Sequence, residues 1–324
     1  MPPRRRLLLS LTAALAASTA LPAQAQAQAF EGPLRMVVPY APGGSSDRVA
    51  RLVADKLGPK LGLTVVVENR TGGGGRIAAQ QLKATPAHQN VLLLANPALM
   101  LVAPLVFKDA GYDPDKDFQP VSQASSYEFA VAVGAGVPVR ELNHLLAWLR
   151  ANPEQANFGV PATGSLPHFF GLMVGEKAGV KAQVVGYRGS GPLLADLMGG
   201  QVPVAFDTFD TLLPQHEAGK IRILAVSSAK RSPFAPAIPT FKEAGLDLGA
   251  DGWNTFFAPA SMPAARAAQF GQAIREVMQD PETVRRFNDA RLGPVASTPE
   301  QTRRMLAAYR AQWAPVVQKS GYQP

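Results

Sequence analysis

The chain has no cysteine among its 324 residues. It therefore forms no disulfide bridge, has no thiolate metal site and carries no cysteine nucleophile. Its four histidines, at positions 88, 144, 168 and 216, are scattered and lack the spacing of metal ligands. After residue 29 the chain has no uninterrupted apolar run of about 18 residues, the length that marks a membrane-spanning helix. We expect neither a metal nor a cofactor.

Enzyme signatures are missing as well. The chain has no Gly-x-Ser-x-Gly elbow, no His-Glu-x-x-His and no Walker loop. The run Gly73-x-Gly75-x-x-Ala78 imitates a dinucleotide fingerprint, but no acidic residue lies between Glu68 and Asp109 to hold a ribose. A flexible turn explains these glycines, and we predict that the protein is not an enzyme.

The first 29 residues have the pattern of an export signal. Arg4, Arg5 and Arg6 precede the apolar stretch Leu7–Ala17, and Ala-Gln repeats offer cleavage sites near residues 25–29. The consecutive arginines also permit a twin-arginine route, and a buried N-terminal helix is the alternative interpretation. The pattern predicts a periplasmic protein.

The net charge is +8, and the three arginines of the signal account for part of it. No basic cluster with interleaved aromatic residues occurs, so a nucleic-acid partner is not expected. A modest positive field instead favours small anionic ligands.

Strand-like runs alternate with helical patterns through most of the chain, which predicts a mostly parallel sheet with helices on both faces. The expected strands are Leu34–Val38, Thr64–Glu68, Val91–Ala95, Phe129–Val133, Ala156–Gly159, Gln183–Val185, Pro203–Phe206 and Ile221–Ser227. The last third is nearly all helical, with helices expected at Pro263–Gln279, Pro281–Ala290 and Pro299–Lys319.

A helical end after two β/α blocks suggests that the chain returns to its first block. We predict a discontinuous domain I, residues 30–124 plus 253–324, and a domain II of residues 125–252. Two short crossing strands form the hinge, and a ligand lies in the cleft between the domains.

The most informative segment is the loop Tyr40–Ser45, which follows the first apolar strand and precedes an amphipathic helix. Glycine permits positive φ angles and a close approach of the ligand to the backbone. The free N–H groups at the start of a helix attract a carboxylate or phosphate. Asp47 either complements the helix dipole or fixes the loop. An ordinary β–α turn is the alternative.

A second strand–loop–helix segment has Ala162, Thr163, Gly164 and Ser165 before a helix that contains His168. Two such loops, one from each domain, can face each other and hold one ligand from both sides. His168 either contacts the ligand or braces the loop.

Three further residues are candidates. Arg188 follows a strand and either pairs with a distal ligand carboxylate or is solvated. Asp207 ends a strand and either accepts a hydrogen bond from the ligand or caps a helix. Trp253 lies at the predicted crossing, where it either closes over the ligand or packs in the hinge.

Together these segments resemble one known family. The matching stretches are Val38–Gly44 with Asp47, Ala50 and Arg51; Val65–Arg70; Tyr112–Pro114 with Lys116–Phe118; Gly164, Ser165 and His168; Tyr187–Ser190; Leu197–Val202; Phe206 and Asp207; Ala218–Lys220; Ala225–Val226 with Ser228–Ser232; and Pro239 and Thr240. Their order and spacing are similar to those of the tripartite tricarboxylate transporter receptors, the Bug receptors, over essentially the whole chain after residue 29.

This resemblance implies a two-domain, periplasmic-binding-protein-like α/β fold of type II that closes on its ligand like a Venus flytrap. It implies a monomer that binds a small organic carboxylate and works with the membrane subunits of that transporter or with a sensor protein. The ligand-binding residues that we predict are Tyr40, Ala41, Pro42, Gly43, Gly44, Ser45, Ala162, Thr163, Gly164, Ser165, His168, Arg188, Asp207 and Trp253.

The sequence departs from the family pattern in the second loop. The usual Gly-Ser-Ser-Gly is replaced by Gly159-Val160-Pro161-Ala162, so two hydroxyl groups are lost and Pro161 stiffens the loop. Dicarboxylates, tricarboxylates, aromatic acids and acidic amino acids are all compatible with a site formed by the two predicted loops. Two other functions stay open: a ligand-carrying sensory receptor without transport, and an exported hydrolase or isomerase that uses Asp207 and His168.

Overall fold

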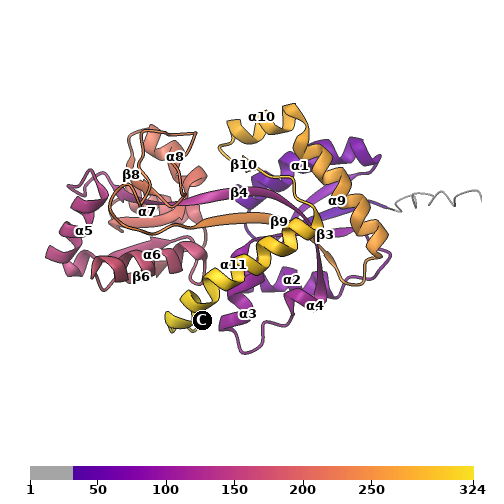
Figure 1. The fold of residues 1–324 in the computed structure, drawn as a ribbon, viewed down its shortest axis with the longest axis horizontal. Coiled ribbons are helices and arrows are strands. Elements are labelled where there is room, and N and C mark those ends of the chain that lie inside the picture. Colours follow the sequence, from indigo (N-terminus) through magenta and orange to yellow (C-terminus); the bar gives the residue numbers. More distant parts are fainter. Residues whose placement is uncertain (1–31) are drawn as a thin grey trace, which may run out of the picture.

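The computed structural model describes residues 32–324, so the predicted export signal lies outside the described residues. Figure 1 shows two groups of elements joined by the long strands β4 (Phe118–Gly134) and β9 (Asp251–Pro259). We call lobe I the group that contains β1 (Leu34–Val38), β2 (Val65–Asn69) and β3 (Val91–Ala95). We call lobe II the group that contains β5 (Asn157–Val160), β6 (Gln183–Gly186), β7 (Val204–Thr208) and β8 (Ile221–Val226).

Lobe I draws on both halves of the chain. β1 pairs in parallel with β2 and β3, while β9 lies antiparallel between β3 and β4. The other elements of this lobe are α1 (Ser45–Leu61), η1 (Gly73–Gly75), α2 (Arg76–Lys83), η2 (Ala98–Val102), α3 (Ala103–Val106), α4 (Pro114–Asp117), α9 (Ala264–Gln279), α10 (Pro281–Asp289), β10 (Gly293–Pro294) and α11 (Pro299–Lys319).

Lobe II is built around the second half of β4. β5 pairs in parallel with β6 and β7, and both β7 and β8 run antiparallel to β4. Its helical elements are α5 (Leu142–Ala151), η3 (Pro153–Gln155), α6 (Leu166–Ala178), α7 (Ser190–Met198) and α8 (Phe209–Glu217).

The predicted mostly parallel sheet is wrong at the centre of the molecule. The parallel pairs are confined to β1–β3 and β5–β7, whereas β4 runs antiparallel to β7, β8, β9 and β10. The reason is topological: β4 and β9 each carry the chain between the lobes, in opposite directions. A strand's apolar pattern does not reveal its direction, so this arrangement was not evident from the sequence.

β4 changes its partners halfway along its length. Residues Phe118–Glu128 pair with β9, and residues Phe129–Gly134 pair with β7 and β8. Two bulges interrupt the pairing with β9, one between Pro120 and Ser122 and one between Gln123 and Ser125. Bulges bend a strand, and here they bend the one that joins the lobes. The domain boundaries stated above stay a prediction.

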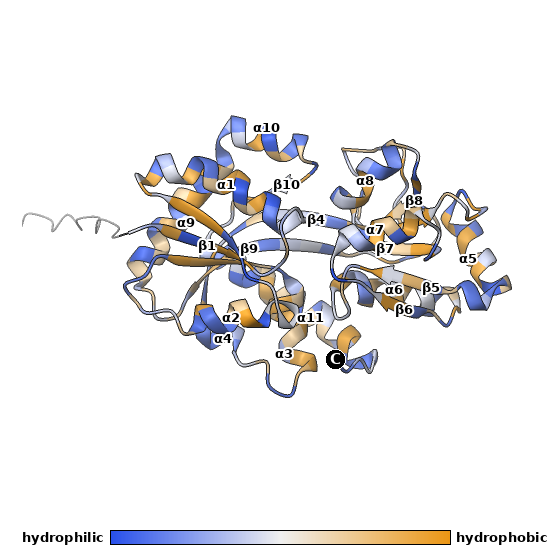
Figure 2. Cartoon of the chain, turned by 180° about the vertical axis from the view of Figure 1, so that it is seen from behind, coloured by the Kyte–Doolittle hydropathy of each residue, from blue (hydrophilic) through white to orange (hydrophobic). Residues whose placement is uncertain are grey.

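Hydrophobic side chains fill three clusters. One lies between the lobe I sheet and α1, α9 and α10, and another lies under α7 and α8 in lobe II. The third runs through both lobes and includes Trp253, Tyr309 and Trp313 of the junction. In Figure 2 the hydrophobic colour gathers on the strands and on helix sides that face them, while α10 is mostly hydrophilic.

Candidate functional site

The carboxyl ends of the parallel strands in the two lobes approach each other. α1 begins just after β1, and α8 begins just after β7. An ion pair joins these two helix starts, because a terminal nitrogen of Arg48 in α1 contacts Oδ2 of Asp210 in α8. The Asp210 side chain is only 1% exposed, whereas that of Arg48 is 33% exposed. Ligands of open α/β sheets bind outside the carboxyl ends of strands, so this junction is the candidate site.

The predicted first loop is held rigidly by lobe I. Gly43 has φ of 88°, a left-handed conformation that favours glycine. Its N–H donates to Oδ2 of Asp47 at 2.8 Å. The amide of Asn69, at the end of β2, donates to the other oxygen of Asp47 and to the carbonyl of Tyr40. Asp47 therefore fixes the loop, one of its two predicted roles.

Two more contacts complete this support. The hydroxyl of Tyr40 donates to Oδ1 of Asn96, just after β3, at 2.7 Å. Arg51 donates to both oxygens of Asp47 at 3.0 Å. Burial works to raise the pKa of Asp47, but the hydrogen bonds from Arg51, Gly43 and Asn69 outweigh it and hold that pKa below its usual value. The carboxylate is thus charged at neutral pH.

The start of α1 offers donors to a ligand. Gly44 is the N-cap residue, and no side chain caps the helix. The first N–H groups of a helix have no partner within the helix and carry partial positive charge. Because the Gly43 N–H is already bonded to Asp47, the donors that this segment offers are the N–H groups of Gly44 and of the first turn. Ala41, Pro42 and Gly43 are exposed, as an open loop requires, and Gly44 is half-buried.

A chain of buried side chains links α1 to both crossing strands. The Ser46 hydroxyl donates to Oδ1 of Asn254 in β9 at 2.6 Å, and the Asn254 amide donates to the Ser125 hydroxyl in β4 at 3.0 Å. All three residues are buried. This connection between the first predicted loop and the crossing strands was not predicted from the sequence.

The predicted second loop has a brace of its own. Gly164 has φ of 75°, and its N–H donates to Nδ1 of His168 at 2.9 Å. The Ser165 hydroxyl caps α6 by accepting from the His168 N–H. His168 is 5% exposed, and burial lowers its pKa to about 4. The imidazole is therefore neutral at neutral pH and able to accept this hydrogen bond.

The C-terminal segment covers this loop. The Tyr322 ring meets the His168 ring edge-on at 5.0 Å and the Phe169 ring at 5.8 Å. α11 crosses the junction diagonally in Figure 1, and its Lys319 pairs with Glu176 of α6. Ala162 is half-buried and Thr163 is exposed; a Cβ placed on Gly186 would meet the Thr163 side chain at 2.4 Å. The second loop thus rests between β6 and the end of the chain.

Arg188 and Asp207 lie at the same edge of lobe II as the second loop. Arg188 is exposed and makes no hydrogen bond or ion pair with any residue in the range 32–324. Asp207 is 1% exposed; its Oδ1 accepts from the Thr208 N–H at 2.7 Å. Burial raises the pKa of Asp207 to about 7, although the Ser190 hydroxyl and the Thr208 N–H oppose this change.

Three polar atoms at this junction are buried and have no hydrogen-bond partner within the described chain: Ser45 Oγ, Asp207 Oδ2 and Asp210 Oδ1. They come from the starts of α1 and α8 and from the end of β7. Unpaired buried polar atoms are uncommon in native proteins, and each calls for an explanation.

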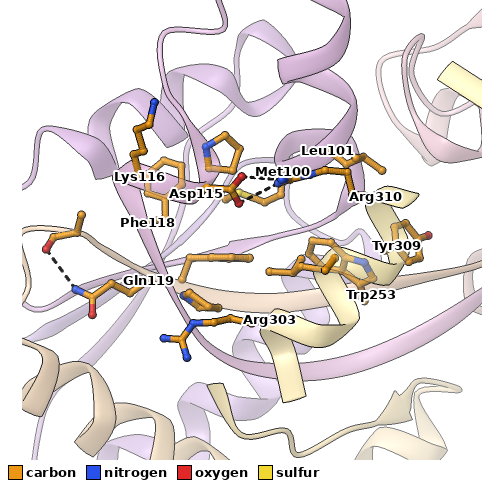
Figure 3. A pocket seen from close by; sticks show the side chains of 16 residues that line it. Met100, Leu101, Asp115, Lys116, Phe118, Gln119, Trp253, Arg303, Tyr309 and Arg310 are labelled. Atoms are coloured by element: carbon orange, nitrogen blue, oxygen red, sulfur yellow. Dashed lines mark hydrogen bonds and ion pairs between the residues drawn. The ribbon is translucent and has the colours of Figure 1, made fainter. Parts of the chain in front are cut away.

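Trp253 lies apart from the other predicted site residues. Its side chain is 2% exposed and meets Tyr309 of α11 edge-on at 5.9 Å. It lines a cavity of about 490 Å³ between α11, α4, β4 and β9, with the Asp115–Arg310 ion pair at its rim (Figure 3). None of the other predicted ligand-binding residues lines this cavity. The placement corresponds to the hinge-packing alternative.

Several residues that build the junction were not among the predicted ones. Arg48, Asn69, Asn96 and Asp210 are polar residues at strand ends or helix starts, which is the signal that points to them. Asn254 lies within β9 and has no such signal. Within residues 32–324 no three His, Asp or Glu side chains gather as metal ligands do. No helix in this range is long and apolar enough to cross a membrane.

Two α/β lobes joined by crossing strands, with glycine loops at a shared junction, define a two-lobed solute-binding protein. Residues 49–322 match the Tripartite tricarboxylate transporter family receptor, and the chain belongs to this family. The resemblance stated from the sequence is thereby confirmed. Members of the family are periplasmic solute-binding receptors.

Relatives match along nearly the whole chain. Protein BugT of Bordetella pertussis is 31% identical over 317 residues, which cover 97% of each chain. The structure of R. palustris Rpa4515 with adipate has a TM-score of 0.86 at 31% identity and covers 90% of this chain and 98% of that one. MatC from Rhodopseudomonas palustris with bound malate has a TM-score of 0.80 at 26% identity, with coverage of 88% and 98%.

Proposed function

We propose that this receptor captures a small organic carboxylate between its lobes, at the junction of the starts of α1 and α8. The observation that carries the proposal is the meeting of a helix start without a side-chain cap and a set of buried, unpartnered polar atoms at one place. A carboxylate accepts from free N–H groups in charge-assisted hydrogen bonds. The adipate and malate of the related structures are ligands of this class.

We propose the following division of roles. Tyr40–Ser45 and the first turn of α1 supply donors from lobe I, and Ala162–Ser165 supply donors from lobe II. His168 acts through Gly164 as a positioning residue. Arg188, exposed and unpaired beside the second loop, attracts a second anionic group of the ligand. Trp253 acts in the hinge.

The finer assignments belong to the same proposal. Residues 1–29 direct the chain to the periplasm and are then removed. The domains are residues 30–124 with 253–324 and residues 125–252, and they close on the ligand by bending β4 and β9. The receptor acts as a monomer, does not transform its ligand, and delivers it to the membrane subunits of a tripartite tricarboxylate transporter.

Calorimetric titration and thermal unfolding with a panel of dicarboxylic, tricarboxylic and aromatic acids test the proposal. A specific acid at 100 times its dissociation constant is expected to stabilise the fold by roughly 2.7 kcal/mol. Failure of every acid in the panel to bind would contradict the proposed function. Recovery of the bound acid unchanged, checked by NMR, is expected of a receptor, and turnover would favour the hydrolase or isomerase alternative.

A matched pair of variants assigns the first loop. Gly43 and Gly62 both have positive φ, 88° and 65°, and a Cβ on either meets nothing within 4 Å. They stand at opposite ends of α1. Gly43→Val is expected to abolish binding, whereas Gly62→Val imposes comparable backbone strain and is expected to keep binding. Equal affinities in the two variants would remove the first loop from the site.

A further inference from the structure

The lobe II side of the junction is acidic. Asp207 and Asp210 lie at the end of β7 and the start of α8, and both are almost fully buried, with 1% and 4% exposed. Arg48 faces them from lobe I, but its guanidinium is already engaged. One terminal nitrogen contacts Asp210, and the other donates to the Gly43 carbonyl at 3.2 Å. Two of its five N–H groups are therefore taken up within the protein, and its charge offsets that of Asp210.

Asp207 and Asp210 differ in the partners that their carboxyl oxygens have. Asp210 has the ion pair with Arg48, and the Ser45 hydroxyl lies near enough to help lower its pKa against burial. Asp207 accepts a hydrogen bond from the Thr208 N–H at Oδ1, and the Ser190 hydroxyl lies near enough to help lower its pKa against burial. Its Oδ2 has no partner within hydrogen-bond distance among residues 32–324. Leaving a buried acceptor unpaired costs about 1–3 kcal/mol, and more for a charged group. Burial raises the pKa of Asp207 to about 7, so the group is partly protonated at neutral pH. Its ionised form only accepts, so a donor at Oδ2 is the partner that this form lacks.

Asp207 also lies beside the second loop. β5 and β7 are parallel, with Phe158 opposite Val204 and Gly159 opposite Ala205. Two residues further along, Asp207 comes level with Pro161, where the second loop begins. A ligand held between the loops therefore passes this oxygen.

We propose that the ligand is a hydroxy- or amino-substituted carboxylic acid whose hydroxyl or ammonium group donates a hydrogen bond to Oδ2 of Asp207. The ligand carboxylate binds the free N–H groups at the start of α1. A plain acid leaves Oδ2 unpaired, and a carboxylate placed beside Asp207 meets like charge. This inference rests on the proposed function and narrows its ligand class.

The test is calorimetric titration with acids that differ only in the donor. One series is succinate, malate and aspartate; a second is adipate, 2-hydroxyadipate and 2-aminoadipate; a third is phenylacetate, mandelate and phenylglycine. In the series that binds, a donor-bearing acid is expected to bind at least tenfold more tightly than the plain acid. A preference for the hydroxyl identifies a hydroxy acid, and a preference for the ammonium identifies an amino acid.

Two variants separate recognition from closure. Asp207→Asn is expected to reduce the preference for the donor-bearing acid to less than threefold. Asp210→Asn removes the charged partner of Arg48, so it is expected to weaken the binding of plain and substituted acids equally. The ratio of their affinities is expected to stay the same. Circular dichroism confirms that each variant is folded.

The possible results separate the donor inference from the proposed function. Equal or tighter binding of the plain acid to the wild-type receptor would overturn the donor inference and leave the proposed function standing. A full preference retained in Asp207→Asn would likewise overturn it. Absence of binding by all nine acids and by the tricarboxylic acids of the panel described above would contradict the proposed function and this inference together.

Discussion

The two loops that we propose to bind the ligand each hold a glycine in the same left-handed conformation, but they do so with different chemistry. Gly43 donates its N–H to the carboxylate of Asp47, and Gly164 donates its N–H to the imidazole of His168, in each case four residues further along. Asp47 is held by charged and polar neighbours, Arg51 and Asn69. His168 is enclosed by aromatic rings.

The same glycine conformation is thus stabilised by an ionised carboxylate in one loop and by a buried, neutral imidazole in the other. The first brace depends on an ionised carboxylate with its own donors. The second depends on burial that keeps the imidazole neutral, and on Tyr322, which comes from the far end of the chain. The first loop is therefore supported within lobe I, while the second is supported by a segment that follows α11.

The largest effect is expected for Asp47→Ala. The change removes the acceptor for Gly43 and the partner of Arg51 and Asn69 together, so we expect a loss of about 3 kcal/mol in unfolding free energy and a loss of measurable ligand binding. Urea denaturation and titration measure both. Asp47→Asn keeps an acceptor for the Gly43 N–H but has no charge, so its stability and affinity are expected to lie between those of the wild type and of Asp47→Ala. An Asn variant as stable and as tightly binding as the wild type would show that the charge of Asp47 does not support the first loop.

The next effect is a pH dependence that belongs to His168. Its pKa is about 4 in the fold and near 6.5 in the unfolded chain, so the unfolded state binds the proton more readily. The stability that this residue contributes is present above pH 6.5 and is lost as the pH falls towards 4, by up to about 3 kcal/mol. His168→Asn is expected to flatten this part of the stability curve in urea denaturation between pH 4 and 7. An unchanged slope would mean that His168 is not kept neutral by burial.

A smaller effect is expected for His168→Ala at pH 7.5. The Gly164 N–H loses its acceptor, which costs about 1–2 kcal/mol, and ligand affinity is expected to fall roughly tenfold as the loop loosens. The oxygen of Asn can replace Nδ1, so His168→Asn serves as the rescue variant in the same titration. Equal loss in both variants would assign a purely space-filling role to the ring.

The smallest effect is expected for Tyr322→Ala. The edge-on ring contacts contribute about 1 kcal/mol, so affinity is expected to fall a few-fold while the first loop is unaffected. Tyr322→Phe is the matched control, because the Tyr322 hydroxyl donates no hydrogen bond within the described residues. If the Phe variant weakens binding as much as the Ala variant, the hydroxyl and not the ring supports the second loop.

Continuous apolar runs allowed the strands to be predicted closely where they are buried on both faces. The limits of β1 and β3 agree with prediction, and those of β5 and β8 differ by about one residue. Those of β2 also differ by about one residue, although most of its residues are only half-buried. β4 begins at Phe118 and not at Phe129, because its first half carries Gln119, Pro120 and several serines between the lobes. That half has neither an alternating nor a continuous apolar pattern.

The site was less accessible to prediction because its contacts are distant in sequence. Strand–glycine–helix patterns locate the two loops, since such a loop lies at a carboxyl end whatever the rest of the fold does. Arg48 and Asp210 are 162 residues apart, and nothing in either segment names the other as its partner. The direction of Trp253 on β9 likewise depends on its register with a bulged neighbour.

The order of strands in lobe I has a consequence for how the protein matures. β9 occupies the middle of that sheet, between β3 and β4, although it is translated after every strand of lobe II. The sheet of β1, β2 and β3 therefore stays incompletely paired until more than three quarters of the polypeptide has been made. Late closure of distant pairs slows folding and leaves strand edges open to aggregation. The strands of lobe II follow one another closely along the chain, so we expect lobe II to form first. β9 then returns to lobe I and pairs between β3 and β4.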